Sequence, residues 1–222
     1  MAVSLGQALD TLGEFSWLLL AIVALHAAVQ VRKYQDTFPT SGPQHVARGL
    51  LATVWFGMGS ALAQTVLLAE PAEAVMLPVA VCVAAYLAVS YCPNDVLYKL
   101  SQSPAVNAVL IVGLEICRAL CVGVGVSGAL KVYSGNNAVA AMVGALRGAW
   151  GWLLGRPGAK VILGQPVGET SWPAPPVSAP ASAVAAVLLV LAGSRSDAEM
   201  IIGGLIAVLV AWRSYEILHS AF

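Results

Sequence analysis

The stretch IVGLEICRALCVGVGV, residues 111–126, is apolar except for one acidic and one basic side chain. It lies within a longer apolar run over residues 105–130. A transmembrane helix needs about 20 apolar residues, so this run is long enough to span a bilayer. A charge at the bilayer centre costs about 2.5–3.5 kcal/mol even on the more lenient scale. Glu115 and Arg118 are three residues apart, so they share one helix face and can pair. The stretch predicts a membrane helix with a charged pair inside it.

The composition of the whole chain agrees with a membrane location. Of its 222 residues, 59% are hydrophobic and 10% are charged, and the mean hydropathy is +0.83. Soluble domains carry about 25% charged residues. The formal net charge is zero, which gives no basis for binding nucleic acid. We predict an all-α, multi-pass membrane protein with no nucleic-acid partner.

Apolar runs predict seven spans within a single transmembrane domain over residues 1–222. The spans are residues 15–31, 49–68, 72–90, 105–130, 138–154, 179–192 and 200–212. Residues 155–180 form the longest predicted loop, and they include most of the segment GETSWPAPPVSAPAS, residues 168–182. Its prolines and glycine predict that this segment is not regular helix.

The basic residues of the loops predict the orientation. One set of alternate loops, together with the C-terminal tail, holds seven basic residues, whereas the other set, with the N-terminus, holds two. The positive-inside rule therefore places the C-terminus and the 155–180 loop in the cytosol. The seven are Arg32, Lys33, Arg48, Lys99, Arg156, Lys160 and Arg213, and the two are Lys131 and Arg195.

Three charged residues remain inside the predicted spans, namely Glu115, Arg118 and Arg147. Arg147 has no acid within its own predicted helix, so we expect a partner elsewhere, and Glu115 is a candidate. One interpretation is a structural ion pair that holds helices together. The other is a hydrated ion path or a site for an anionic lipid headgroup. The charges alone leave both open.

Glycines concentrate in the second, fourth and fifth predicted spans. They can allow close helix packing, or they can permit kinks and local unwinding beside protein or water. If spans one to three and four to six are repeats, the repeats are inverted, with a site near the midplane where they meet. The residues are Gly57, Gly59, Gly123, Gly125, Gly144 and Gly148.

The sequence gives no sign of enzyme chemistry. We find no cysteine and histidine cluster with metal-ligand spacing, and no serine or cysteine nucleophile with a plausible histidine partner. We therefore expect a non-enzyme without a metal or a cofactor.

Four short features occur in an order that resembles the trimeric intracellular cation (TRIC) channels. They are GSALAQTVLLAEP (59–71), YLAVSYCPNDVLYKL (86–100), GLEICRALCVGV (113–124) and VGALRG (143–148). The most specific is the part from Tyr91 to Lys99, which combines Cys-Pro, Asp and Tyr-Lys at the family's spacing.

The resemblance implies seven helices, arranged as two inverted three-helix repeats plus a seventh. It also implies a potassium-conducting pore within each subunit of a homotrimer in the endoplasmic reticulum membrane. Glu115, Arg118 and Arg147 would then lie near the pore or near bound membrane lipids. A non-conducting structural subunit of a larger membrane complex is the alternative, and seven-helix sugar transporters with parallel repeats also fit the number of spans.

One departure concerns the family motif Lys-Glu-Val-x-Arg and the basic residues after it, which bind phosphatidylinositol bisphosphate. Leu114 replaces the leading lysine, and Leu120 and Cys121 occupy the later basic positions. A headgroup bearing several negative charges would find only Arg118 and Arg147. The resemblance therefore leaves phospholipid binding as an expectation but argues against tight phosphoinositide binding.

Overall fold

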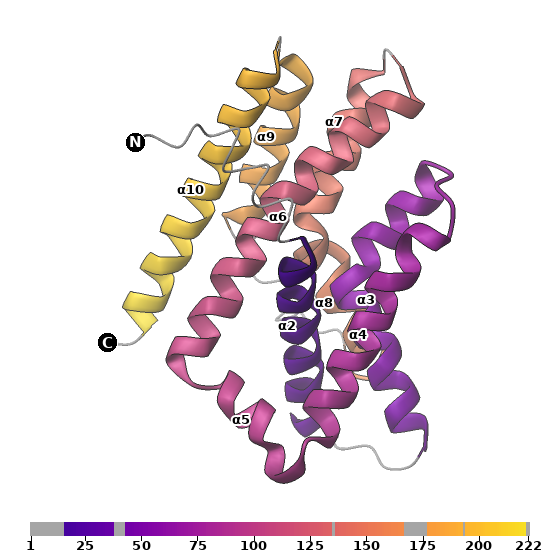
Figure 1. Cartoon of the computed structure of the whole chain (residues 1–222), viewed down its shortest axis with the longest axis vertical. Coiled ribbons are helices and arrows are strands. Elements are labelled where there is room, and N and C mark those ends of the chain that lie inside the picture. The colour runs from indigo at the N-terminus through magenta and orange to yellow at the C-terminus, as the bar shows by residue number, and fades with distance from the viewer. Residues whose placement is uncertain (1–15, 38–42, 135, 167–176, 193, 221–222) are drawn as a thin grey trace. The chain divides into compact units, whose positions relative to one another are not determined.

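The computed structural model describes the chain apart from residues 1–15, 38–42, 135, 167–176, 193 and 221–222. The elements within these described ranges are all helical (Figure 1). They are α2 (Ser16–Thr37), α3 (Pro43–Leu67), α4 (Glu73–Tyr91), η1 (Pro93–Asp95), α5 (Val96–Ser101), α6 (Pro104–Val132), α7 (Asn137–Trp150), η2 (Gly151–Gly155), α8 (Arg156–Ile162), α9 (Ser178–Leu191) and α10 (Arg195–Ser220).

The chain forms two compact units, each built from segments that are distant in sequence. Unit 1 comprises Met1–Leu19, Val112–Ala149 and Pro176–Phe222, and unit 2 comprises Leu20–Ile111 and Trp150–Pro175. We expected one transmembrane domain over the whole chain. The boundary between the two units falls within α6 and within the predicted fifth span, and the single transmembrane domain stays a prediction.

Unit 2 has an apolar core shared by α2, α3, α4 and α8. Eight fully or nearly buried residues form its centre: Ala28, Val29, Val31, Ala52, Tyr86, Val89, Ala159 and Leu163. Three of the eight are alanines, one each from α2, α3 and α8, and such small residues allow membrane helices to approach closely. The Tyr86 hydroxyl is buried, and it is 3.3 Å from Gln35 Nε2, so its polar end is satisfied.

Unit 1 contains most of α6, nearly all of α7, and the whole of α9 and α10. Figure 1 shows α9 and α10 side by side. Only 11% of the apolar window of α10 is buried, compared with 39% for α6. A helix that is apolar and exposed in this way suits a lipid environment.

The described helices include four that are long and apolar enough to cross a membrane, and six if each of two bent pairs counts as one span. One bent pair joins Val75–Tyr91 to Pro93–Ser101 at 92°. Asn94 and Asp95 both have left-handed backbone conformations at this bend, with φ of 58° and 55°. The second pair joins Asn137–Trp150 to Leu153–Ile162 at 65°.

The loop predicted over residues 155–180 is shorter in the structure. Helix α8 occupies Arg156–Ile162, and α9 begins at Ser178 within the segment that we predicted to be non-helical. The prolines do not prevent this, because Pro157 and Pro180 lie in the first turns of α8 and α9. The first turn of a helix tolerates proline, since its N–H groups have no partner within the helix.

Candidate functional site

The carboxylate of Glu115 lies at the centre of a charged network in unit 1. Glu115 is on α6 and is 0% exposed. Its Oε2 is 2.5 Å from Nη1 of Arg118, one turn further along the same helix. The structure thus confirms the local pair that the i, i+3 spacing predicts.

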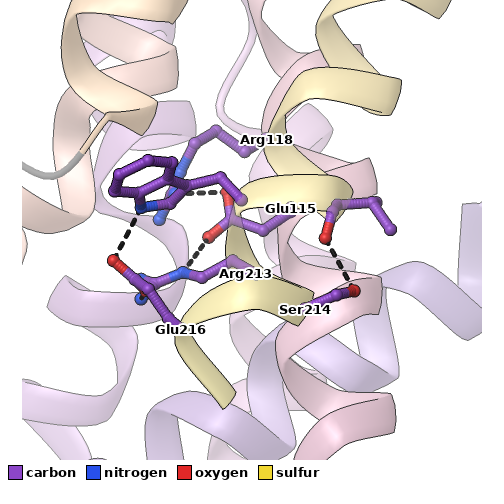
Figure 2. A network of polar contacts seen from close by, with 7 residues as sticks. Glu115, Arg118, Arg213, Ser214 and Glu216 are labelled. Atoms are coloured by element: carbon purple, nitrogen blue, oxygen red, sulfur yellow. Dashed lines mark hydrogen bonds and ion pairs between the residues drawn. The ribbon is translucent and has the colours of Figure 1, made fainter. Parts of the chain in front are cut away.

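A second arginine reaches the same carboxylate from α10. Arg213 Nε donates to Glu115 Oε1 at 3.0 Å, and its Nη1 pairs with Glu216 (Figure 2). The Trp212 indole N–H donates in turn to Glu216 Oε1 at 2.7 Å. The network therefore joins α6 to α10 through Glu115 and Arg213, which are 98 positions apart along the chain.

The sequence did not identify Arg213 as part of this site. We placed it in a C-terminal tail after a span ending at residue 212, whereas α10 continues to Ser220. The available signal was the spacing of Arg213 and Glu216, which places both on one helix face if the helix continues.

The charges of this network balance. Glu115 and Glu216 carry two negative charges, and Arg118 and Arg213 carry two positive charges. Each Glu115 oxygen has its own guanidinium, an arrangement that compensates a fully buried carboxylate. Such a network can hold two helices together, and it can present guanidinium groups to an anion or border a hydrated path.

Arg147 lies on α7, and its Nη2 is 3.7 Å from Cys121 Sγ on α6. Glu115 was one candidate for its partner, and the Glu115 oxygens accept hydrogen bonds from Arg118 and Arg213. Arg147 therefore contacts the helix that carries Glu115 and Arg118, at Cys121, about one turn after Arg118.

The glycines of unit 1 serve close packing. Helix α6 runs unbroken through Gly123 and Gly125, so the unwinding that the glycine cluster allows does not occur there. An added Cβ would lie 3.0 Å from the Gly144 Cα if it were on Gly125, and 2.5 Å from the Ser182 side chain if it were on Gly148. These glycines let α6 and α7 approach at backbone distance and let the Ser182 side chain of α9 pack against Gly148.

In unit 2, Gly57 and Gly59 lie in an unbroken α3 and accommodate side chains of neighbouring segments. A Cβ on Gly57 would lie 3.1 Å from Cys82 Sγ, and one on Gly59 would lie 2.6 Å from Trp150 Nε1. A side chain at Gly59 would force Trp150 to move, whereas at Gly57 it would make a tight contact with Cys82.

The break in the fifth predicted span falls at Gly151–Gly155, where the chain forms one turn of π-helix. The Trp55 indole donates to the Leu154 carbonyl at 2.9 Å, and the Trp150 indole donates to the Trp55 carbonyl at 3.2 Å. The two rings are 5.1 Å apart. This tryptophan pair was not predicted, because the sequence does not show that residues 95 positions apart meet.

No group of three or more His, Cys, Asp or Glu side chains that could hold a metal ion occurs among the described residues.

A family model described as TRIC channel matches residues 50–211. The chain belongs to the TRIC channel family. This match confirms the relationship that the sequence motifs indicated, and it makes the chain an integral membrane protein of a family of cation channels. No curated protein gives a significant match.

Solved TRIC structures share the fold of the chain. A trimeric intracellular cation channel from C. elegans with bound Ca²⁺ is 23% identical, has a TM-score of 0.80, and is aligned over 96% of this chain and 97% of that one. A trimeric intracellular cation channel from C. elegans in the absence of Ca²⁺ is 19% identical, has a TM-score of 0.72, and is aligned over 89% of each chain. A third structure, from work on the structural basis for activity of TRIC counter-ion channels in calcium release, is 18% identical and has a TM-score of 0.69. It is aligned over 90% of this chain and 92% of that one.

Proposed function

We propose that this chain is a monovalent cation channel that conducts potassium, with a pore in each subunit of a homotrimer. The observation that supports this most strongly is the family match over residues 50–211. The solved relatives are described as trimeric cation channels and as counter-ion channels in calcium release. An intracellular membrane, the endoplasmic reticulum above all, is the location that this activity favours.

The proposed subunit has seven spans, arranged as two inverted three-helix repeats plus a seventh helix. In this arrangement α2, α3 and α4 would form the first repeat, and α6, the broken α7–α8 pair and α9 the second. Helix α10 would be the seventh, with a cytosolic C-terminus according to the bias of basic residues.

Glu115, Arg118 and Arg147 are the residues that we place beside the ion path, and Arg213 joins them. Charges persist within a span when they are paired or face water, and these groups are held together on α6, α7 and α10. Phospholipid headgroups are further proposed partners. Tight phosphoinositide binding is not proposed, because Arg118 and Arg213 already share the Glu115 carboxylate.

Recording from the purified chain in planar bilayers tests this proposal. We expect a potassium current whose reversal potential follows the potassium gradient. Glu115→Gln removes the buried charge and should alter unitary conductance, whereas Glu73→Gln, at the exposed first turn of α4, serves as the matched control. No current from folded, reconstituted protein would contradict the proposal. An unchanged conductance in Glu115→Gln would remove that residue from the path.

A non-conducting structural subunit is the second candidate, and one observation favours it. The Glu115 carboxylate is fully buried, and its two oxygens pair with Arg118 and Arg213. A structural link between α6 and α10 requires such an arrangement. Native mass spectrometry in mild detergent separates the two candidates. A homotrimer supports the channel, whereas a stable hetero-complex without a homotrimer supports the structural subunit.

A further inference from the structure

Two cysteines of α6 lie close to Arg147 of α7 in unit 1, and the proposed conduction assigns no role to these cysteines. Cys117 and Cys121 are four residues apart, so they lie on one helix face. Arg147 Nη2 lies 3.7 Å from Cys121 Sγ, within hydrogen-bonding distance of sulfur.

Two glycines bring the arginine to the thiol. An added Cβ on Gly125 would lie 3.0 Å from both the Arg147 Cδ and the Gly144 Cα. The aliphatic part of Arg147 therefore crosses α6 directly over Gly125, and its guanidinium reaches Cys121 one turn earlier. A larger residue at position 125 would push the arginine away, so the contact depends on this backbone approach.

The surroundings of Cys121 are those of a reactive thiol. The nucleophilic form of cysteine is the thiolate, which a neighbouring positive charge stabilises. Arg147 supplies a permanent charge. Cys121 and Cys117 are partly exposed, whereas Cys82 is fully buried in unit 2, where its sulfur lies against Gly57. The guanidinium also disfavours a metal cation at this sulfur, because like charges repel.

We propose that Cys121 is a modification site that reacts with small hydroperoxides such as hydrogen peroxide. Arg147 stabilises negative charge on the sulfur, and the thiol proton passes to the peroxide oxygen that departs. The sulfur attacks one peroxide oxygen, so that an S–O bond forms and the O–O bond breaks. The departing hydroxide takes up a proton and becomes water. Cysteine is oxidised by two electrons to a sulfenic acid, and the peroxide is reduced. Arg147 is a positioning residue in this reaction.

The test uses the full-length protein in detergent micelles, treated with hydrogen peroxide. A dimedone probe then traps sulfenic acids, and peptide mass spectrometry gives the labelling rate at each cysteine. We expect Cys121 to label fastest and Cys82 slowest. In Arg147→Gln the Cys121 rate should fall about tenfold, because the neighbouring charge is lost. Arg147→Lys keeps that charge and should retain most of the rate.

Cys92, which follows α4 in unit 2, provides an internal control, since its rate should be equal in all variants. Equal Cys121 rates in the wild-type protein and in folded Arg147→Gln would overturn the proposal. If Arg147→Gln does not fold, the test uses the labelling rates of the wild-type protein. A Cys121 rate no higher than those of Cys82 and Cys92 would then overturn the proposal. The measurement needs no ion current, so its result is independent of whether the protein conducts.

Discussion

The contact between α3 and the π-helical turn in unit 2 differs in chemistry from the contact between α6 and α10 in unit 1. Both connect residues nearly 100 positions apart. In unit 2 the link consists of two neutral indole N–H groups that donate to backbone carbonyls. In unit 1 it consists of two guanidinium groups around one fully buried carboxylate.

The two contacts differ in the free-energy cost of losing one partner within a membrane. An indole that donates to a carbonyl satisfies both groups, and its loss leaves one neutral acceptor without that donor. A carboxylate within a span requires its partners, because removing one leaves an uncompensated charge in a medium of low dielectric constant. The tryptophan contact is therefore sufficiently explained by packing, whereas the charged contact is the better candidate for a functional role.

The largest effect should follow from Glu115→Ala. It leaves Arg118 and Arg213 close together without the carboxylate between them, so the two like charges repel. We expect a loss of about 3 kcal/mol in the free energy of unfolding. Thermal unfolding in detergent micelles would measure it. Glu216→Ala, at the more exposed end of the network, is the control and should cost less than half as much. Equal losses would show that burial of Glu115 does not set the energy.

The glycine contacts should give an intermediate effect. Gly148→Ala places a methyl group 2.5 Å from the Ser182 side chain, and we expect a loss of about 2 kcal/mol from overpacking. Gly204→Ala on α10 is the matched control, because no atom of the described residues lies within 4 Å of the added atom. That change should leave stability equal or raise it by up to about 1 kcal/mol, since alanine favours helix. Similar melting temperatures for the two variants would contradict close packing at Gly148.

The sequence predicted what depends on composition and local spacing. The apolar runs of α3 and α6 indicated membrane helices, and the i, i+3 spacing predicted the pair of Glu115 and Arg118. The sequence motifs also indicated the family. What depends on tertiary contacts was missed, namely the Arg213 bond to Glu115, the tryptophan pair, and the helical start of the expected loop at Arg156. For Arg213 and Arg156, hydropathy ended the helix where the polar residues began, although the helix continues there. The tryptophan pair joins residues 95 positions apart, a contact that local spacing does not indicate.

The smallest effect should come from Trp55→Phe, which keeps an aromatic ring but removes the N–H that donates to the Leu154 carbonyl. A neutral hydrogen bond of this kind contributes about 1 kcal/mol. Trp17→Phe, at a position 65% exposed, is the control and should leave stability unchanged. Because the lost bond reaches the π-helical turn, hydrogen exchange should accelerate over Gly151–Gly155 and the following α8, while exchange in α6 stays the same. If exchange in α6 accelerates equally, the indole bond stabilises the whole molecule rather than this turn, and the two contacts are not energetically separate.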